Sequence, residues 1–162
     1  MRHTINILSV LMFVMLGTNT ALAAKGSIEI KTEVKKVEVT TVYGEKKVRE
    51  VEAKTVIPGD ELLYTVYFKN IDRVPVDNIE ITDPIPKSTL YKVGSAFGTG
   101  TEITFSVNGG KSYAAAEDLT VTNSKGETRR AQPADYTDIR WVFIPKLAPG
   151  KTGTVQFRVT VK

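Results

Sequence analysis

Hydrophobic and polar residues alternate along most of the chain after residue 27, and a period of two is typical of half-buried β-strands. The clearest case is residues 62–69, where Leu62, Tyr64, Val66 and Phe68 share one face. The pattern predicts further strands at residues 28–39, 48–57, 79–81, 90–93, 103–107, 119–122, 139–143 and 154–162. The helical period is confined to a possible single turn at residues 114–119.

Short strands separated by Gly, Pro and Asn, without alternating helices, predict an all-β fold: an antiparallel β-sandwich. Pro84 and Pro86 should end the strand that contains Ile79 and Ile81, because proline cannot donate to a ladder. Trp141 lies on a predicted central strand and is expected in the core, where its indole N–H would need a partner. We find no repeat or linker, so residues 24–162 are expected to form one domain.

The sandwich is predicted to carry an additional charged hairpin at its N-terminal end. Apolar positions change parity at Lys35-Lys36, which suggests a β-bulge or a strand that changes sheets. A turn is predicted at residues 43–46, followed by a more polar strand over residues 48–57. Lys and Glu on such a hairpin suit an exposed edge, where charge discourages unwanted pairing.

Residues 1–23 have the features of a secretory signal peptide. A short basic start precedes an apolar run over residues 5–16, and Ala21-Leu22-Ala23 supplies small residues for cleavage. The run is shorter than the roughly 20 residues that a membrane-spanning helix needs. We therefore expect export to the periplasm or beyond, with cleavage after Ala23 and no lipid anchor or membrane insertion afterwards.

Composition excludes several kinds of chemistry. The chain has no Cys, and its one His is His3, inside the predicted signal peptide. The usual zinc and copper ligands and the base of Ser–His–Asp or Cys–His catalysis are therefore missing after cleavage. The net charge of +4 is mild, and the basic residues are not massed with aromatic ones, which argues against nucleic-acid binding.

An ordered series of motifs carries a resemblance to a known family. Pro58-Gly59-Asp60 opens a strand that Asn70 closes; the segments 78–86 and 94–95, Trp141 and Leu147-Ala148-Pro149-Gly150 follow in order. This resembles, over residues 56–162, the conserved-repeat family known as domain of unknown function number eleven. The resemblance implies an immunoglobulin-like fold in a surface or secreted bacterial protein, with a structural or adhesive role and no assigned catalytic residues. The single copy and the charged hairpin at residues 27–56 depart from the usual tandem pattern.

The segment Ser106-Val107-Asn108-Gly109-Gly110-Lys111-Ser112-Tyr113 is similar to the aspartate-box hairpin, with Asn in place of Asp. A single copy cannot build the propeller in which that motif recurs. Asn and Gly favour a tight turn, so we interpret the segment as structural, with the Asn side chain bonding back to the turn and the aromatic ring packed over it.

Carboxylates could in principle form a calcium site or a catalytic pair. Calcium needs six to eight oxygen ligands, and the acidic residues in question are spread over several loops, which favours turn capping; they are Asp77, Asp83, Glu117, Asp118, Asp135 and Asp138. A weak calcium site of Asp135 and Asp138 beside the Asp83 loop stays an alternative.

A carboxylate pair for glycoside hydrolysis has no support in the sequence, and a Lys–Asn cross-link is disfavoured because residues 152–162 contain neither Asn nor Asp.

The sequence therefore predicts an exported, non-catalytic structural or interaction module without cofactor or metal. We expect it to bind a protein of the bacterial envelope through loops or strand edges, and the polar edge at residues 48–57 is a candidate for strand addition. The alternative is a glycan-binding module with exposed tyrosines, drawn from Tyr43, Tyr67, Tyr91 and Tyr113. An Asp/Glu-only hydrolase is the least favoured reading.

Overall fold

The computed structural model describes residues 28–162, and the predicted signal peptide lies outside them. The described chain is nearly all β, with antiparallel sheets and one short 3₁₀ turn, η1 (Pro133–Asp135), so the predicted all-β class is confirmed. The strands are β1 (Ile28–Val42), β2 (Glu45–Glu52), β3 (Glu61–Asn70), β4 (Ile79–Pro84), β5 (Thr89–Tyr91), β6 (Phe97–Gly98), β7 (Thr101–Ser106), β8 (Thr120–Thr122), β9 (Thr128–Arg130), β10 (Asp138–Phe143) and β11 (Thr152–Val161).

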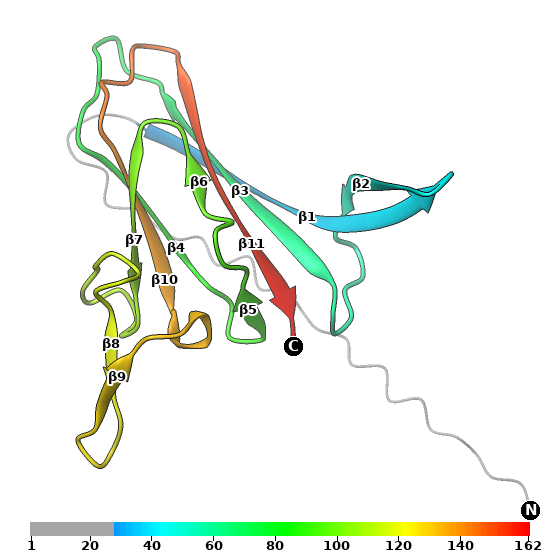
Figure 1. Ribbon diagram of the computed structural model, residues 1–162. Helices are drawn as coiled ribbons and strands as arrows, with labels where there is room; N and C mark the ends of the chain where they lie inside the picture. Colours follow the sequence, from blue (N-terminus) through cyan, green and yellow to red (C-terminus); the bar gives the residue numbers. More distant parts are fainter. Residues whose placement is uncertain (1–27) are drawn as a thin grey trace, which may run out of the picture.

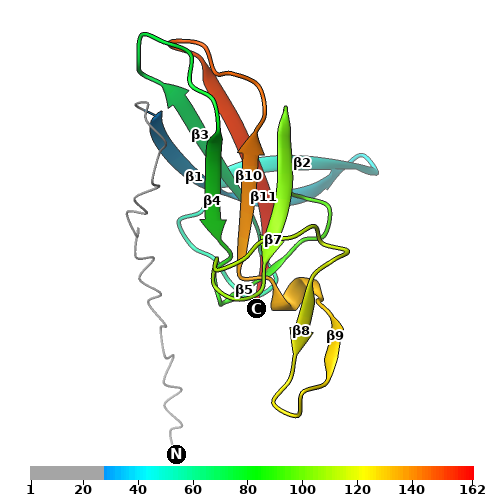
Figure 2. The same ribbon diagram turned by 90° about the vertical axis from the view of Figure 1, so that its left-hand side faces the viewer.

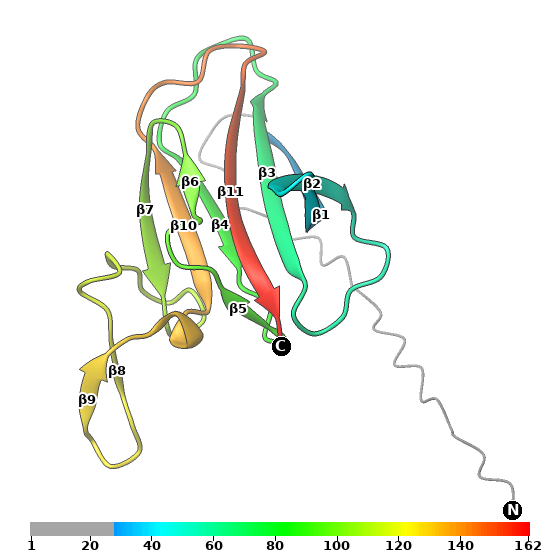
Figure 3. The ribbon, with the colours of Figure 1, turned by 45° about the vertical axis from the view of Figure 1, so that its right-hand side comes forward.

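The strands form two main layers. The first sheet has the order β2-β1-β3-β11-β5, with β6 also paired to β11, and the second has the order β4-β10-β7. The layers lie side by side along most of their length (Figures 1 and 3), whereas the small β8–β9 hairpin extends from one end of the second layer (Figure 2).

The core lies between these layers because alternate residues of each long strand face inward. In β11, Val155, Phe157 and Val159 are completely buried, as is Trp141 in β10. The Phe157 ring stacks on Tyr64 at a centroid distance of 4.9 Å and lies 6.0 Å from the Trp141 ring. The predicted central role of Trp141 is thus confirmed. Its indole Nε1–H, however, has no hydrogen-bond partner among residues 28–162, in contrast to the expectation.

Asn70 joins two of the loops at one end of the layers. Its side-chain Nδ2 donates to the carbonyls of Val74 and Leu147, both at 2.8 Å, and the residue is completely buried. Its backbone N–H also donates to the carbonyl of Lys151. A residue at the end of β3 therefore ties its own loop to the Leu147-Ala148-Pro149-Gly150 segment, which is 77 positions away at Leu147.

Several element predictions need correction. The second strand of the hairpin covers Glu45–Glu52 and not residues 48–57, because the chain leaves the sheet after Glu52. The segment at residues 114–119 contains only a non-helical turn, and the 3₁₀ turn instead follows Gln132, where Pro133 is compatible with a first helical position. The strands β6 and β9 were not predicted, because β6 has only two residues and β9, Thr128–Arg130, contains no apolar residue that could show a period.

The change of parity at Lys35-Lys36 does not mark a bulge or a change of sheet, so that prediction is wrong. β1 pairs with β3 without interruption from Ile28 opposite Asn70 to Val37 opposite Glu61. Val34 lies on the core-facing side, whereas Val37 lies on the opposite side, the same as Leu63. Both Val37 and Leu63 are buried, yet neither belongs to the main core cluster. The apolar positions change parity because β1 leaves the core and is covered on its other face.

Candidate functional site

The β1–β2 hairpin extends beyond the body of the protein. Only residues 28–37 of β1 pair with β3, so from Glu38 onward β1 is paired with β2 alone. The last part of β1 and the first part of β2 therefore form a two-stranded ribbon, which projects sideways from the two layers (Figures 1 and 2). We call residues 38–49 the projecting ribbon.

A two-residue turn at Tyr43 and Gly44 closes this ribbon, one position earlier than the centre of the turn predicted at residues 43–46, because Glu45 and Lys46 already belong to β2. Tyr43 and Gly44 both have positive φ, at 52° and 83°, which is the requirement of a type I′ turn. Such a turn makes Val42 and Glu45 a hydrogen-bonded pair, and hydrogen-bonded and non-bonded pairs then alternate along the ladder. The turn therefore decides which backbone groups of β2 point towards β1 and which point away.

The outer edge of β2 follows from this alternation. Glu45, Lys47 and Arg49 direct their backbone N–H and C=O groups to β1, and the even-numbered residues direct theirs outward. The Glu52 carbonyl accepts a hydrogen bond from Lys54, which leaves Lys46, Val48 and Glu50 as the outward-facing residues of the edge. No strand within residues 28–162 pairs with this side of β2.

Apolar and charged side chains occupy the two faces of the ribbon unevenly. Val39 and Val48 lie opposite each other on one face and are 60% and 59% exposed. The other face carries the cross-strand pair of Glu38 and Arg49. Exposed valines on a two-stranded ribbon are unusual, because their packing against a covering layer is what favours β-branched residues in sheets.

Two ion pairs stabilise the base of the hairpin. The Lys36 ammonium lies 2.9 Å from an Asp60 carboxylate oxygen, and Asp60 also accepts the backbone N–H of Ile57. These bonds, the one from Lys36 first, lower the pKa of Asp60 below its ordinary value. The more exposed pair of Lys35 and Glu50 is longer, at 3.6 Å. The base of the hairpin is thus fixed to the body, and the tip is not.

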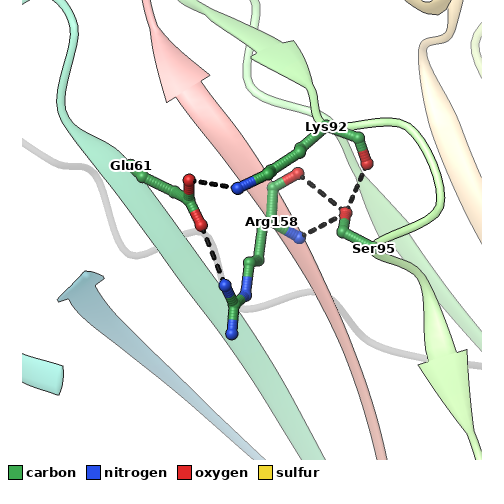
Figure 4. A network of polar contacts seen from close by, with 4 residues as sticks. All are labelled: Glu61, Lys92, Ser95 and Arg158. Atoms are coloured by element: carbon green, nitrogen blue, oxygen red, sulfur yellow. Dashed lines mark hydrogen bonds and ion pairs between the residues drawn. The ribbon is translucent and has the colours of Figure 1, made fainter. Parts of the chain in front are cut away.

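A second polar cluster lies where β3, β11 and the segment after β5 meet (Figure 4). The Glu61 carboxylate accepts hydrogen bonds from Lys92 at 2.5 Å and from Arg158 at 3.0 Å. The Ser95 hydroxyl donates to the Lys92 carbonyl and accepts the Arg158 N–H. Burial raises the pKa of Glu61, but the two cationic partners outweigh it, and the net pKa is lowered. Sequence reasoning missed this cluster, because its partners are 31 and 97 positions from Glu61.

The structure does not bring the six candidate calcium-binding carboxylates together in a cluster. Both oxygens of Asp135 accept from the Arg129 guanidinium, at 2.7 and 2.8 Å, and Gln132 N–H donates to the same group. No group of three or more acidic, His or Cys side chains with metal-binding geometry occurs among residues 28–162. Asp83 and Asp138 do interact. Burial first, and then the charge of Asp138, raise the pKa of Asp83 to about 7.

The turn at residues 106–113 has the predicted arrangement around Asn108. The Asn108 Oδ1 atom accepts the backbone N–H groups of Lys111 and Ser112, each at 3.1 Å. The buried Ser106 hydroxyl accepts the N–H groups of Asn108 and Gly110. These bonds hold the turn together, as the structural interpretation of the segment predicts.

The four tyrosines proposed for stacking on glycans are scattered and mostly engaged. Tyr91 is buried and its hydroxyl accepts the N–H of Ala96, while the Arg140 guanidinium lies 4.5 Å from the centre of the Tyr113 ring. Tyr67 is half-buried, and Tyr43, at the tip of the hairpin, is fully exposed. The structure therefore leaves one open ring and no platform of several rings within the described residues.

Comparison with known protein families, characterised proteins and solved structures finds no match for this chain. No helix within residues 28–162 is long and apolar enough to cross a membrane.

Proposed function

We propose that this chain is an exported, non-catalytic interaction module with an immunoglobulin-like β-sandwich fold, which binds a protein partner by strand addition at β2. One observation carries the proposal: the outward-facing residues of β2, Lys46 and Val48 on the projecting ribbon and Glu50 at its base, pair with no strand other than β1 within residues 28–162. An extended segment that pairs with such an edge gains main-chain hydrogen bonds, and the alternate side chains give specificity.

The composition of the edge supports recognition over indiscriminate pairing. Proteins protect exposed edges with charged side chains, and β2 carries Lys46 and Glu50 on either side of Val48. A partner strand must therefore place an acid and a base at matching positions and an apolar residue between them. The proposal also includes export and membership of the family known as domain of unknown function number eleven. Both are supported by the sequence alone.

Site-specific photo-crosslinking in intact cells tests this proposal. A photoreactive residue at Lys46 should give a discrete protein adduct in the exported fraction, and the same residue at the exposed Lys125 on the β8–β9 turn should not. Val48→Pro should remove the Lys46 adduct, because proline eliminates an outward N–H without breaking a bond to β1. Equal labelling from both positions, or an adduct that persists with proline, would contradict strand addition.

A further inference from the structure

We infer that the partner of the β2 edge is a second copy of this chain, paired antiparallel about a two-fold axis at Val48. This inference rests on the proposed function, because it names the partner of the same edge. Three properties of β2 support it: the order of charges along the edge, the exposed valines and the free space around the ribbon.

Symmetry restricts how two copies of β2 can pair. The axis that relates two antiparallel edge strands is perpendicular to the sheet, so each side chain keeps its face. Outward-facing residues of one copy must therefore lie opposite outward-facing residues of the other. The possible registers differ only in the residue that lies on the axis opposite its own copy.

The charges of β2 select one register. An axis at Lys46, Lys47, Arg49 or Glu50 places that charged side chain directly opposite the same charge, which is destabilising in antiparallel pairs. An axis at Val51 places Glu50 opposite Glu52. Axes at Val48 and Val51 both place an uncharged residue opposite itself, but only the axis at Val48 also sets Lys46 opposite Glu50 of the second copy, twice by symmetry.

On the opposite face of the ribbon, this register brings two basic side chains together. There Lys47 lies opposite Arg49 of the second copy. Each Arg49, however, already has Glu38 as its cross-strand neighbour in its own hairpin, and Glu45 lies diagonally across the new pair. The acidic residues thus balance the basic ones on that face.

The valines and the shape of the hairpin favour the same pairing. Val39 and Val48 of one copy and Val48 and Val39 of the other would form a continuous apolar row over four strands. A two-stranded ribbon is only marginally stable in water, whereas a four-stranded sheet has neighbours for its inner strands. The ribbon projects away from both layers, which leaves room for a second molecule beside it (Figures 1 and 2). The contact is small, so we expect a weak, concentration-dependent dimer.

Single cysteines test the register in a chain that has none of its own. In an antiparallel hydrogen-bonded pair the Cα atoms are about 5.5 Å apart, which a disulfide can bridge. Val48→Cys should therefore form a disulfide-linked dimer in oxidised glutathione about tenfold faster than Lys46→Cys alone, since the two copies of position 46 are separated by roughly 13 Å or more. A mixture of Lys46→Cys and Glu50→Cys should cross-link across the interface.

The outcomes separate this inference from the proposed function. Fast dimerisation of Val48→Cys with a cross-linking mixture supports the Val48-centred dimer. If Val48→Cys is no faster than Lys46→Cys, the second copy is rejected, and a photo-adduct from Lys46 with a different protein would then retain the edge as a binding site. Failure of both experiments rejects both proposals. Circular dichroism of each variant, compared with the unsubstituted chain, controls for loss of fold.

Discussion

The core between the sheets and the projecting ribbon are both built from alternating strands, and they differ in what covers them. In β11, Val155 and Val159 are completely buried because the second sheet lies over them. In the ribbon, Val39 and Val48 occupy equivalent alternate positions, yet more than half of each side chain is exposed. Alternation therefore identifies a strand and its two faces, but a second layer decides whether an apolar face becomes core or remains available for binding.

The largest test of this comparison removes one apolar side chain from each region. Phe157→Ala should lower the free energy of unfolding by about 3–5 kcal/mol, because it deletes a completely buried ring that contacts Tyr64 and Trp141. Val48→Ala should change it by less than about 0.5 kcal/mol in dilute solution, since Val48 is mostly exposed. Urea unfolding of the two variants measures the difference. Similar losses would mean that the ribbon is as well covered as the core.

The same comparison explains how far the sequence could predict the molecule. Strands such as β3 and β11 were predictable, because one face is buried along ten residues and alternation is then strict. The end of β2 was misplaced because neither of its faces is covered by the body, so its side chains carry no clear period. Alternation predicts strands but not the order in which they pair. The sequence therefore could not show that β1 keeps one register through Lys35-Lys36, and that the change of parity there reflects a change in which face of β1 is covered.

The candidate site was predictable in kind and not in detail. The charged hairpin and its exposed edge follow from the sequence, and so does the presence of a turn near Gly44, although it is centred one position earlier than predicted. The outward-facing set of Lys46, Val48 and Glu50 required the register, which a single sequence does not contain. The Glu61 cluster was not predictable at all, because it joins three distant segments.

A second test concerns Asp83, a carboxyl group in the body whose ionised form is disfavoured by burial. Asp83 has a pKa of about 7 in the folded protein, above its ordinary 3.8, because burial and Asp138 oppose its charge. Asp83 therefore ionises at lower pH in the unfolded chain than in the folded protein. The free energy of unfolding consequently falls as pH rises from about 4 to 7. Asp83→Asn should therefore stabilise the protein by about 1–3 kcal/mol at pH 8 and have little effect at pH 4.

Thermal unfolding of Asp83→Asn and the unsubstituted protein at both pH values measures this effect. Asp77→Asn is a matched control, because Asp77 is exposed and forms only a 3.6 Å ion pair with Lys146. A stabilisation by Asp83→Asn that is the same at pH 4 and pH 8 would show that ionisation of Asp83 is not its cause.

The smallest test compares two glutamates at the junction between body and ribbon. Glu61→Gln should cost about 1–2 kcal/mol at pH 7, because it removes the charge that holds Lys92 and Arg158 at 2.5 and 3.0 Å. Glu50→Gln should cost less than about 0.5 kcal/mol, since its pair with Lys35 is exposed and 3.6 Å long.

The pKa of Glu61 is lowered in the folded protein, because its bonds to Lys92 and Arg158 outweigh the effect of burial. Its contribution is therefore present above its ordinary value of 4.5 and is lost as pH falls further. Urea unfolding at pH 7 and pH 3.5 should show the Glu61→Gln deficit shrinking at the lower pH. A constant deficit would assign the loss to packing rather than to charge, and the junction would then be stabilised in the same way as the core.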